Sequence, residues 1–533
     1  MIARRNVLAA GLWMLALLAL PANAQNRNPW TIPGTLRVAI VADPQTLDPI
    51  LQTNIYQGFI NALCFDGLLA SAGNGDLYPA LARRVPTFQN GDISRDGKTI
   101  RFELRRGVVF HDGAPFTSAD VAFTWRARMN PKNNVVNRLG YNQIERIDTP
   151  DPYTAVLHMK RAYSPILTVL AGGYILPAHL LAKYPDLNQA AFNDHPIGTG
   201  PYKFVRWIRG DRIEYVRNDR YFEKPRLTNI VVKIIPQDST AALQVRTHDI
   251  DWYPFPQTTS YRQSQGIPGI RTLALSANAV RQIVINTTHP PLDDVRVRQA
   301  LALAIDRKLI TEHVAYDTAQ AACGDLPSSS WAYDPTVTCR YDPEEARRIL
   351  AELGWEPGAD GILVRNGRPL GLTMVFAAGA TETAAVALQL QAMLKAVGVD
   401  TELHTYAGSM LFAPAADGGI LESGRFDLDV SAFYSPPDPD DSRLLTCANR
   451  APAGFNVSRY CSPEMDAAQR ESLQTFDRAQ RKRVISRIQH MVVRDVPTIY
   501  LWWPKELHLV NSDVSGIEVP PGVDSPYTYM WSI

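Results

Sequence analysis

The stretch "RFELRRGVVFHDGAPFTSADVAFTWRA", residues 101–127, contains a strand, a turn and the start of a helix. Apolar and charged residues alternate over residues 99–105, which predicts a half-buried strand. Thr117 stands three residues before Asp120, a spacing typical of the capping box at a helix start. Strand and helix therefore follow one another closely here, as expected in a mixed α/β fold.

The link between this strand and this helix carries His111, Asp112 and Gly113, which could be a catalytic pair or a polar turn. Glycine accepts a positive φ angle, and an aspartate can accept a hydrogen bond from its own backbone. A general base needs a partner within hydrogen-bond reach, and the neighbouring sequence offers none. We therefore expect a turn and no catalytic residue.

The rest of the chain continues the alternation of strands and helices. Residues 197–235 are rich in strands, with a hairpin turn at 209–211. The segment 291–314 has an apolar stripe at helical spacing and is predicted to form one long amphipathic helix. Further helices are expected over 342–353, with Asp342 as the N-cap, and over about 380–397.

Size and charge limit the kind of protein this can be. The chain has 533 residues, of which 46% are hydrophobic and 20% are charged. This length is too great for one compact core, so two or three lobes are expected. Lys and Arg total 54 against 53 Asp and Glu, so the surface has no strong net field. Nucleic acid is therefore not an expected partner, and an anionic membrane is not expected as the main partner.

The first 24 residues are typical of an export signal. Arg4 and Arg5 precede an apolar run from Val7 to Leu20, and Ala22-Asn23-Ala24 matches a cleavage site. The run is short for a membrane span, and a membrane anchor is the alternative interpretation. We predict cleavage after Ala24, which removes two of the 54 basic side chains and leaves 52 against 53 acidic ones. Whether export is general or uses the twin-arginine route stays open.

An exported protein meets an oxidising compartment, which gives meaning to the five cysteines. Cys323 and Cys339 enclose one loop rich in Pro, Gly and Ser, and Cys447 and Cys461 enclose another. We predict two local disulfides from these four residues, although the sequence alone leaves the connectivity open. Cys64 lies in an apolar stretch and is expected to be a buried free thiol.

Signatures of enzymes and metal sites are absent from the sequence. It contains no nucleophile elbow, P-loop, dinucleotide glycine fingerprint, H-E-x-x-H or C-x-x-C motif. The acidic run 438–441 could bind calcium, but Pro439 and the lack of spaced oxygen ligands favour a turn. We therefore predict no metal, no cofactor and no catalytic residue.

Several separated segments, in order along the chain, resemble one family, the extracellular solute-binding proteins of family 5. The family comprises periplasmic dipeptide, oligopeptide and nickel-chelate binders of ABC importers. The resemblance covers about residues 36–510, nearly all of the mature chain. It is carried by "RDGKTIRFELRRGVVFHDGAPFTSADVAFTW" from residue 95, "IGTGPYKFVRW" at 197, "DDVRVRQALALAIDRKLI" at 293, "YDPEEARRILAELGW" at 341 and "FDLDVSAFYSPPDPDD" at 426.

The resemblance implies a periplasmic, monomeric binding protein with two lobes, a hinge and an inserted domain. A small solute would bind between the lobes, and a permease and ATPase complex in the inner membrane would receive it. The implied units are residues 25–70, 190–282 and 496–533 for lobe I, 71–189 for the inserted domain, and 283–495 for lobe II.

The sequence departs from the family at two charged anchor points. Peptide binders of the family hold the amino terminus with an Asp that follows a Trp, whereas Phe433 and Ser435 stand near these positions. Dipeptide binders also use an Arg for the carboxylate, and none occurs between Arg368 and Arg425. The ligand is therefore expected to be a longer or modified peptide, or a non-peptide solute such as an opine, a sugar conjugate or a metal chelate.

The same alignment points to seven candidate ligand-binding residues, although their register is open. If the register is shifted, Asp438 or Asp440 would hold an amine instead. The alternative functions are an exported hydrolase and a peptide-binding sensor. The candidates are Thr53, Asn54 and Gln57 in lobe I, and Phe433, Tyr434, Ser435 and Asp438 in lobe II.

Overall fold

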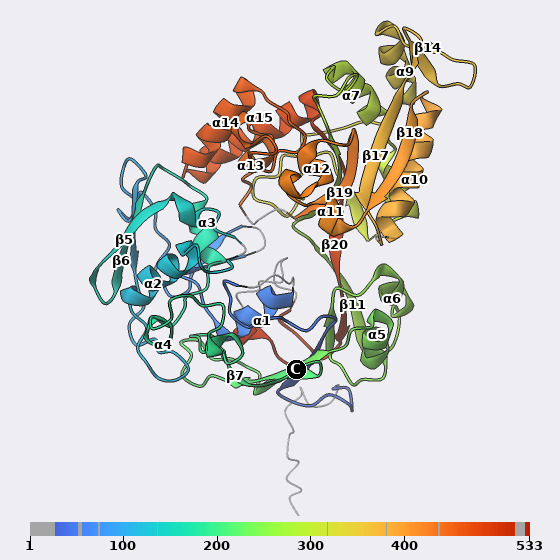
Figure 1. Cartoon of the computed structure of the whole chain (residues 1–533). Coiled ribbons are helices and arrows are strands. Elements are labelled where there is room, and N and C mark those ends of the chain that lie inside the picture. Colours follow the sequence, from blue (N-terminus) through green and yellow to red (C-terminus); the bar gives the residue numbers. More distant parts are fainter. Residues whose placement is uncertain are drawn as a thin grey trace, which may run out of the picture.

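The computed structural model describes residues 27–51, 56–72, 75–135, 137–316, 318–379, 381–434, 438–517 and 528–533. The export signal predicted over residues 1–24 lies outside these ranges. The described chain forms two lobes and a third unit; Figure 1 shows lobe I below, lobe II above and the third unit at the left. This is the two-lobed α/β fold with an additional unit that the sequence predicts.

Lobe I is built on five strands in the order β7-β8-β9-β1-β10. The side chains of β1 alternate between two cores: Val38 packs with α1, and Ala39 packs with α5 on the opposite face. Gly210 (φ 71°) lies in the turn between β7 and β8, which confirms the predicted hairpin. The elements are β1 Thr35–Ile40, β7 Tyr202–Ile208, β8 Arg212–Arg217, β9 Asn229–Ile234, β10 Trp252–Pro254, α1 Tyr56–Cys64, α5 Asp238–Arg246 and α6 Thr258–Gln263.

Lobe II carries the other half of the same sheet, in the order β18-β17-β19-β12. Helix α10 covers one face through Val386 and Leu390, and α14 and α15 cover the other through Met465 and Val484. The elements are β12 Ala279–Ile285, β17 Gly371–Ala377, β18 Asp400–Tyr406, β19 Leu428–Tyr434, α9 Pro343–Glu352, α10 Thr381–Ala396, α11 Gly408–Leu411, α12 Ile420–Ser423, α13 Ser442–Leu445, α14 Pro463–Gln474 and α15 Arg478–Asp495, with the small sheet β14 Glu356–Pro357, β15 Leu363–Arg365 and β16 Arg368–Pro369.

Strand β20 (Thr498–Asn511) joins the two halves of the sheet. Its first part pairs with β12 and with β13 (Ala319–Ala321) in lobe II. Its second part pairs with β10 and with β11 (Ile270–Ser276) in lobe I. Among the described residues, the chain passes between the lobes only here and at the link from β11 to β12, residues 277–278. Two adjacent crossings of this kind allow the lobes to rotate without breaking either sheet half.

The third unit has its own hydrophobic core, formed by residues between Leu68 and Ile175. A three-stranded sheet in the order β4-β6-β5 packs against α2, whose N-terminus has the predicted capping box of Thr117 and Asp120. Its elements are β2 Leu69–Ser71, β3 Leu77–Pro79, β4 Thr99–Glu103, β5 Ile144–Asp151, β6 Thr154–Met159, α2 Ser118–Met129, α3 Ile166–Ala171 and α4 Ala178–Leu181.

The predicted long helix over 291–314 is wrong, because the segment forms two helices. Helix α7 covers Val295–Leu303 and α8 covers Arg307–His313. The Asp306 side chain accepts a hydrogen bond from the Leu309 N–H at 3.0 Å and so begins a new helix. The break changes the direction of the second helix, and Ile310 is buried in place of Leu309. Among the described residues, none of the helices has both the length and the apolar character needed to cross a membrane.

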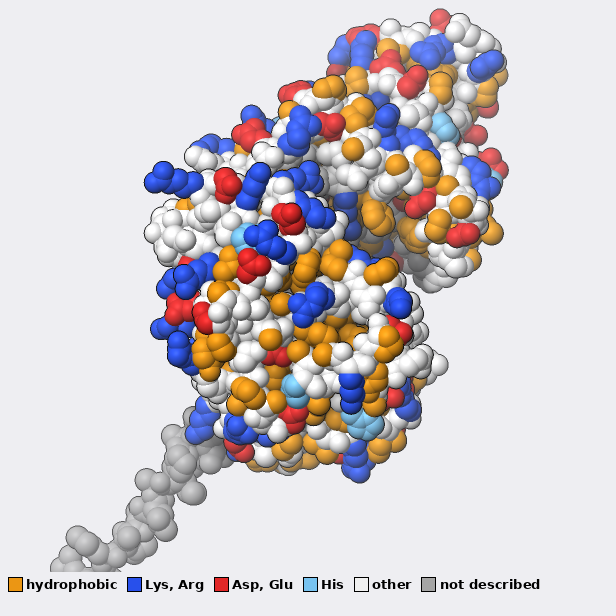
Figure 2. All heavy atoms as spheres, turned by 60° about the vertical axis from the view of Figure 1, so that its left-hand side comes forward, with side chains coloured by type: hydrophobic (Ala, Val, Ile, Leu, Met, Phe, Trp, Pro, Cys, Tyr) orange, Lys and Arg blue, Asp and Glu red, His pale blue; other side chains and the backbone are white. Residues whose placement is uncertain are grey.

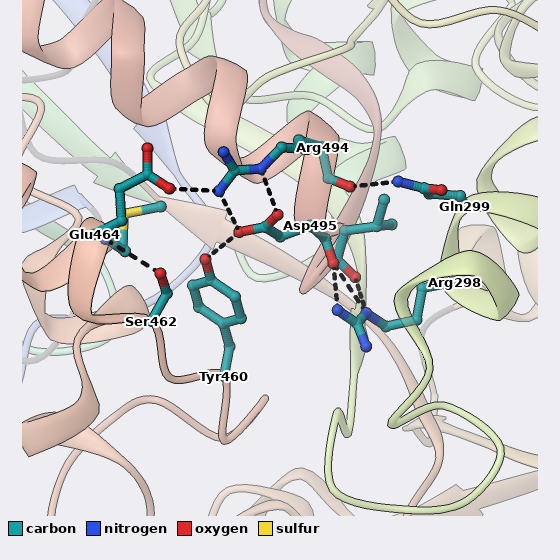
Figure 3. A network of polar contacts seen from close by, with 9 residues as sticks. Arg298, Gln299, Tyr460, Ser462, Glu464, Arg494 and Asp495 are labelled. Atoms are coloured by element: carbon teal, nitrogen blue, oxygen red, sulfur yellow. Dashed lines mark hydrogen bonds and ion pairs between the residues drawn. The ribbon is translucent and has the colours of Figure 1, made fainter.

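A polar network fixes the C-terminus of α15, directly before the hinge strand β20 (Figure 3). The guanidinium of Arg298 on α7 donates hydrogen bonds to the Asp495 carbonyl at 2.6 Å and to the Val496 carbonyl at 3.1 Å. The Asp495 carboxylate accepts hydrogen bonds from Tyr460 and Arg494. These contacts satisfy carbonyl groups that the helix end leaves without partners, and they hold the start of β20 rigidly in lobe II.

Both predicted disulfides are present. Cys323 is bonded to Cys339, and Cys447 is bonded to Cys461. Cys64 is a free and buried cysteine, as expected. Each bridge closes a loop of lobe II, so these cysteines stabilise one lobe and do not link the two lobes.

Candidate ligand-binding site between the lobes

The side chains of His111 and Asp112 point to different partners. The Nε2 atom of His111 lies 3.0 Å from the Gly200 carbonyl oxygen, and its Nδ1 atom accepts a hydrogen bond from the Gly198 N–H at 3.3 Å. Burial lowers the pKa of His111 to about 4, so the ring is neutral at pH 7. Asp112 contacts His179 at 2.7 Å. His111 therefore holds the turn against lobe I, Asp112 holds it against α4 of the third unit, and the two residues do not form a catalytic pair.

On lobe II, a cation lies where β12 and β20 approach the first turn of α10. Arg281 on β12 is half-buried and contacts the Glu382 carboxylate at 3.3 Å. A small cavity beside this pair, also lined by Ser431 and Trp502, has a volume of about 10 Å³. That is room for about one water molecule. Glu382 thus neutralises Arg281 in this structure, and a ligand carboxylate would have to displace it.

A second guanidinium lies beside the end of β19. Arg443 of α13 stacks on the ring of Phe433 at 5.1 Å and on the ring of Phe455 at 5.8 Å. Its Nε atom is buried and has no hydrogen-bond partner among the described residues. Tyr434 and Phe455 are 65% and 67% exposed, which is unusual for such large aromatic side chains. This end of lobe II therefore combines one cation with three aromatic rings.

The carboxylates of the run 438–441 are already engaged. Asp438 is buried and accepts hydrogen bonds from both terminal nitrogens of Arg481 on α15. Asp440 accepts a hydrogen bond from the Tyr163 hydroxyl at 3.1 Å and one from the Ser442 N–H at 3.0 Å. A ligand ammonium would have to compete with these donors for either carboxylate.

One buried carboxyl group on β19 has an oxygen without a partner. Asp429 accepts a hydrogen bond from the Ser431 hydroxyl at 2.7 Å, while its Oδ1 atom is buried and has no partner in the part of the chain that the structure describes. Burial raises the pKa of Asp429 to about 7. The group is therefore close to half-protonated at neutral pH, and it is not a fixed negative charge for an amine.

The third unit contacts lobe II on the side opposite the hinge strand, and Figure 1 shows α3 near α13 and α14. Besides the Tyr163–Asp440 hydrogen bond, the Ser164 N–H donates to the Leu473 carbonyl at 2.7 Å. The rings of Phe88 and Phe476 lie 5.4 Å apart in an edge-to-face arrangement. The region between the lobes is therefore bounded by β20 on one side and by this contact on the other.

The structure places only some of the predicted ligand-binding residues. Phe433, Tyr434 and Asp438 flank the segment 435–437, although Asp438 is turned toward Arg481. Thr53, Asn54, Ser435 and the side chain of Gln57 lie outside the described residues. These seven assignments stay predictions.

Arg281 and Arg443 lie outside residues 368–425, the segment in which the family pattern predicts an arginine. Arg281 is the single charged residue of β12, "AVRQIVI", which is apolar apart from Arg281 and Gln282. A lone cation in such a strand was a signal that could have identified it.

Comparison with known proteins agrees with this geometry. The family model of bacterial extracellular solute-binding proteins, family 5, matches residues 76–454. The chain is 28% identical to di/tripeptide-binding protein 2 of Pseudomonas aeruginosa, with 96% of each chain covered. It is also 28% identical to the glutathione-binding protein GsiB of Pectobacterium atrosepticum, with 98% of this chain and 96% of that protein covered.

A solved structure shows the same arrangement of lobes. NikZ from Campylobacter jejuni in complex with Ni(L-His) is 26% identical, with a TM-score of 0.77 over 94% of this chain and all of that chain. Matches of this extent include both lobes and the third unit. The chain therefore belongs to the bacterial extracellular solute-binding proteins of family 5, which bind solutes and are not enzymes.

Proposed function

We propose that this protein captures a small solute between its two lobes and presents it, chemically unchanged, to an ABC permease and ATPase complex. It works as a monomer in the periplasm after cleavage behind Ala24. The observation that carries this proposal is that the described chain crosses between the lobes at two adjacent places, β20 and residues 277–278. Rotation there closes the lobes on a ligand, which excludes water and strengthens every polar contact inside.

The side chains of lobe II favour a ligand that carries a carboxylate. Arg281 and Arg443 are the cations near the end of the sheet, whereas Asp438 is already bound to Arg481. The paired N–H groups of an arginine match the two oxygens of a carboxylate. A ligand carboxylate would displace Glu382 from Arg281, and Glu382 would neutralise Arg281 again after the ligand is released. The relatives named above bind di- and tripeptides, glutathione and a nickel–histidine complex, all of which are small solutes with carboxylates.

The exposed rings add a second requirement. Tyr434 and Phe455 offer flat apolar surface beside Arg443, and such rings usually become covered in a functional state. The ligand class we infer is therefore a carboxylate-bearing, peptide-like solute with an apolar or planar part. A plain dipeptide is disfavoured, because neither Asp438 nor Asp440 offers an unpaired carboxylate to its ammonium group.

The ligand can be identified by mass spectrometry of whatever is released when the purified protein is denatured. Candidates are then ranked by thermal shift, because a ligand at a hundred times its Kd adds about 2.7 kcal/mol to the unfolding free energy. Arg281→Gln and Arg443→Gln should each weaken binding of the identified solute, whereas Arg470→Gln on the exposed face of α14 should not.

Three results would count against the proposal. If both arginine variants bind the solute as well as the unmodified protein, the inferred carboxylate site is wrong. If a candidate solute is converted to a product, the hydrolase alternative replaces transport. Absence of permease and ATPase genes beside this one would favour the peptide-binding sensor.

A further inference from the structure

A separate cavity lies on the third unit, where it meets lobe I, away from the hinge strands. Its volume is about 490 Å³. Four segments that are distant in the sequence line it: Arg83, residues 105–109, Thr199 and residues 220–222. Four of the ten lining residues are arginines. We propose that this cavity is a second binding site, for a compact oxyanion with two or more negatively charged phosphate or carboxylate groups.

Three of the four arginines have no acidic partner. Arg83 contacts Glu103, but Arg105, Arg106 and Arg220 make no ion pair with any described residue. The protein as a whole has nearly equal numbers of acidic and basic side chains, so an uncompensated cluster of this kind departs from its average surface. Figure 2, in which the third unit comes forward, shows several Lys and Arg side chains along the left edge of this face. A bound anion would supply the missing negative charge.

Aromatic rings hold two of these guanidinium groups in place. Arg105 lies over the ring of Phe222 at 4.7 Å, and its Nε atom donates to the Ala80 carbonyl at 2.5 Å. Arg106 lies over the ring of Tyr153 at 4.7 Å. Stacking of this kind fixes the plane of a guanidinium and leaves its remaining N–H groups directed outward. The arginines are therefore organised before any ligand arrives.

The floor of the cavity contains hydroxyl groups that are themselves fixed. Thr199 and Tyr221 both donate hydrogen bonds to the buried Asp66 carboxyl, at 2.8 and 2.9 Å. Burial raises the pKa of Asp66 to about 6, and the nearby Arg105 opposes this shift. This one buried carboxyl group lies near Arg105, whereas four arginines line the cavity, so the local balance stays positive.

The chemistry of the lining determines the ligand class. Guanidinium groups bind phosphate and carboxylate oxygens through paired N–H donors, and a single charge would leave two of the three cations unmatched. The volume suits a small molecule. The site shares no lining residue with the region around Arg281 and Tyr434, so it does not rest on the proposed transport function.

Calorimetric titration of the full-length mature protein with sodium pyrophosphate and with sodium citrate, at low ionic strength, tests the proposal. Binding should be saturable for at least one of them. Arg106→Ser and Arg220→Ser should each raise the Kd, and the double variant should raise it about tenfold or more, since each removes a charge-assisted hydrogen bond. Arg483→Ser, an exposed arginine of α15, should leave the Kd unchanged.

Vesicles distinguish a soluble anion from a lipid headgroup that carries the same phosphate chemistry. Arginine-dependent sedimentation with vesicles that contain cardiolipin, whose headgroup carries two phosphates, but not with phosphatidylcholine vesicles, would identify a headgroup as the ligand. Hydrogen exchange of the unmodified protein gives a second readout, in which pyrophosphate or citrate should protect residues 105–109 and 220–222. No binding to either probe or to the anionic vesicles overturns the proposal, as does equal affinity of the double variant. Loss of this site leaves the solute bound between the lobes unaffected, so the two proposals fail separately.

Discussion

Arg481 of α15 and Asp438 form a two-pronged ion pair inside lobe II, with each side chain only 6% exposed. The Nη1–Oδ2 distance is 2.6 Å, and Nη2 contacts the other carboxylate oxygen. Asp438 directly follows the segment 435–437 at the end of β19. The pair therefore fixes the chain at the point where the candidate ligand-binding region begins.

Replacing Arg481 by Met should lower the unfolding free energy by about 3–5 kcal/mol, because it leaves the buried Asp438 carboxylate without its partner. Urea unfolding measures this change. Arg483→Met, two residues along the same helix but exposed, should change the value by no more than about 0.5 kcal/mol. Similar losses in the two variants would show that the pair contributes little to stability.

The contact between the third unit and lobe II depends on the Tyr163 hydroxyl. Tyr163→Phe removes its hydrogen bond to the buried Asp440 and should cost about 1–3 kcal/mol in urea unfolding. Tyr341→Phe, at a residue that is 52% exposed, is the matched control and should be neutral. An unchanged urea midpoint for Tyr163→Phe would mean that water hydrogen-bonds to Asp440 in place of the hydroxyl, with no loss of unfolding free energy.

Asp429 should make the protein less stable as the pH rises. Its pKa is about 7 in the folded protein against 3.8 for an ordinary Asp, so the folded state binds more protons than the unfolded state between these values. The contribution is complete below about pH 4 and is lost up to about pH 7, at up to about 1.4 kcal/mol for each pH unit.

Urea unfolding from pH 4 to 8 compares the unmodified protein with Asp429→Asn, which imitates the protonated group. The unfolding free energy of the variant should not show the loss that deprotonation of Asp429 causes. The variant should therefore gain stability relative to the unmodified protein as the pH rises. Parallel curves for the two proteins would show that Asp429 titrates normally.

Tyr434→Ala should weaken binding of the solute that mass spectrometry identifies, while leaving the fold intact. The side chain is 65% exposed at the end of β19, so its loss leaves no cavity in the core. Loss of one aromatic anchor should raise the Kd about tenfold, as measured by calorimetry. An unchanged Kd, with an unchanged melting temperature, would remove this segment from the binding site.

The Cys447–Cys461 bridge should contribute about 3 kcal/mol, because it closes a short loop and restricts the unfolded chain. Cys447→Ser with Cys461→Ser should therefore lower the urea midpoint. Alkylation of the unreduced, denatured protein checks that four cysteines are in disulfides, since only Cys64 should react. Labelling of more than one cysteine would contradict the assigned bridges.

Local features were predictable because each depends on a few neighbouring residues. The capping box at Thr117, the Asp342 cap of α9 and the hairpin at Gly210 all formed as expected. The one long helix over 291–314 was wrong because the apolar stripe continued through a position where Asp306 could cap a second helix. Periodicity alone does not distinguish these two outcomes.

The binding region was less accessible to sequence reasoning. Arg281, Arg443 and Asp438 lie on different elements, and their partners are Glu382, two phenyl rings and Arg481. Those pairings decide which charges a ligand can meet, and they join residues separated by up to 101 positions.

The sequence by itself determined the α/β alternation, the two disulfide loops, the structural role of the turn at His111 and the family. These follow from short-range spacing and from motifs in a fixed order. Only the tertiary structure decided that β20 pairs with both lobes, that Arg481 binds the Asp438 carboxylate, and that three arginines without an ion pair to any described residue meet at one cavity. The physical reason is that these contacts depend on how distant segments pack against one another. The local sequence pattern around a residue does not determine which side chain from a distant segment will contact it.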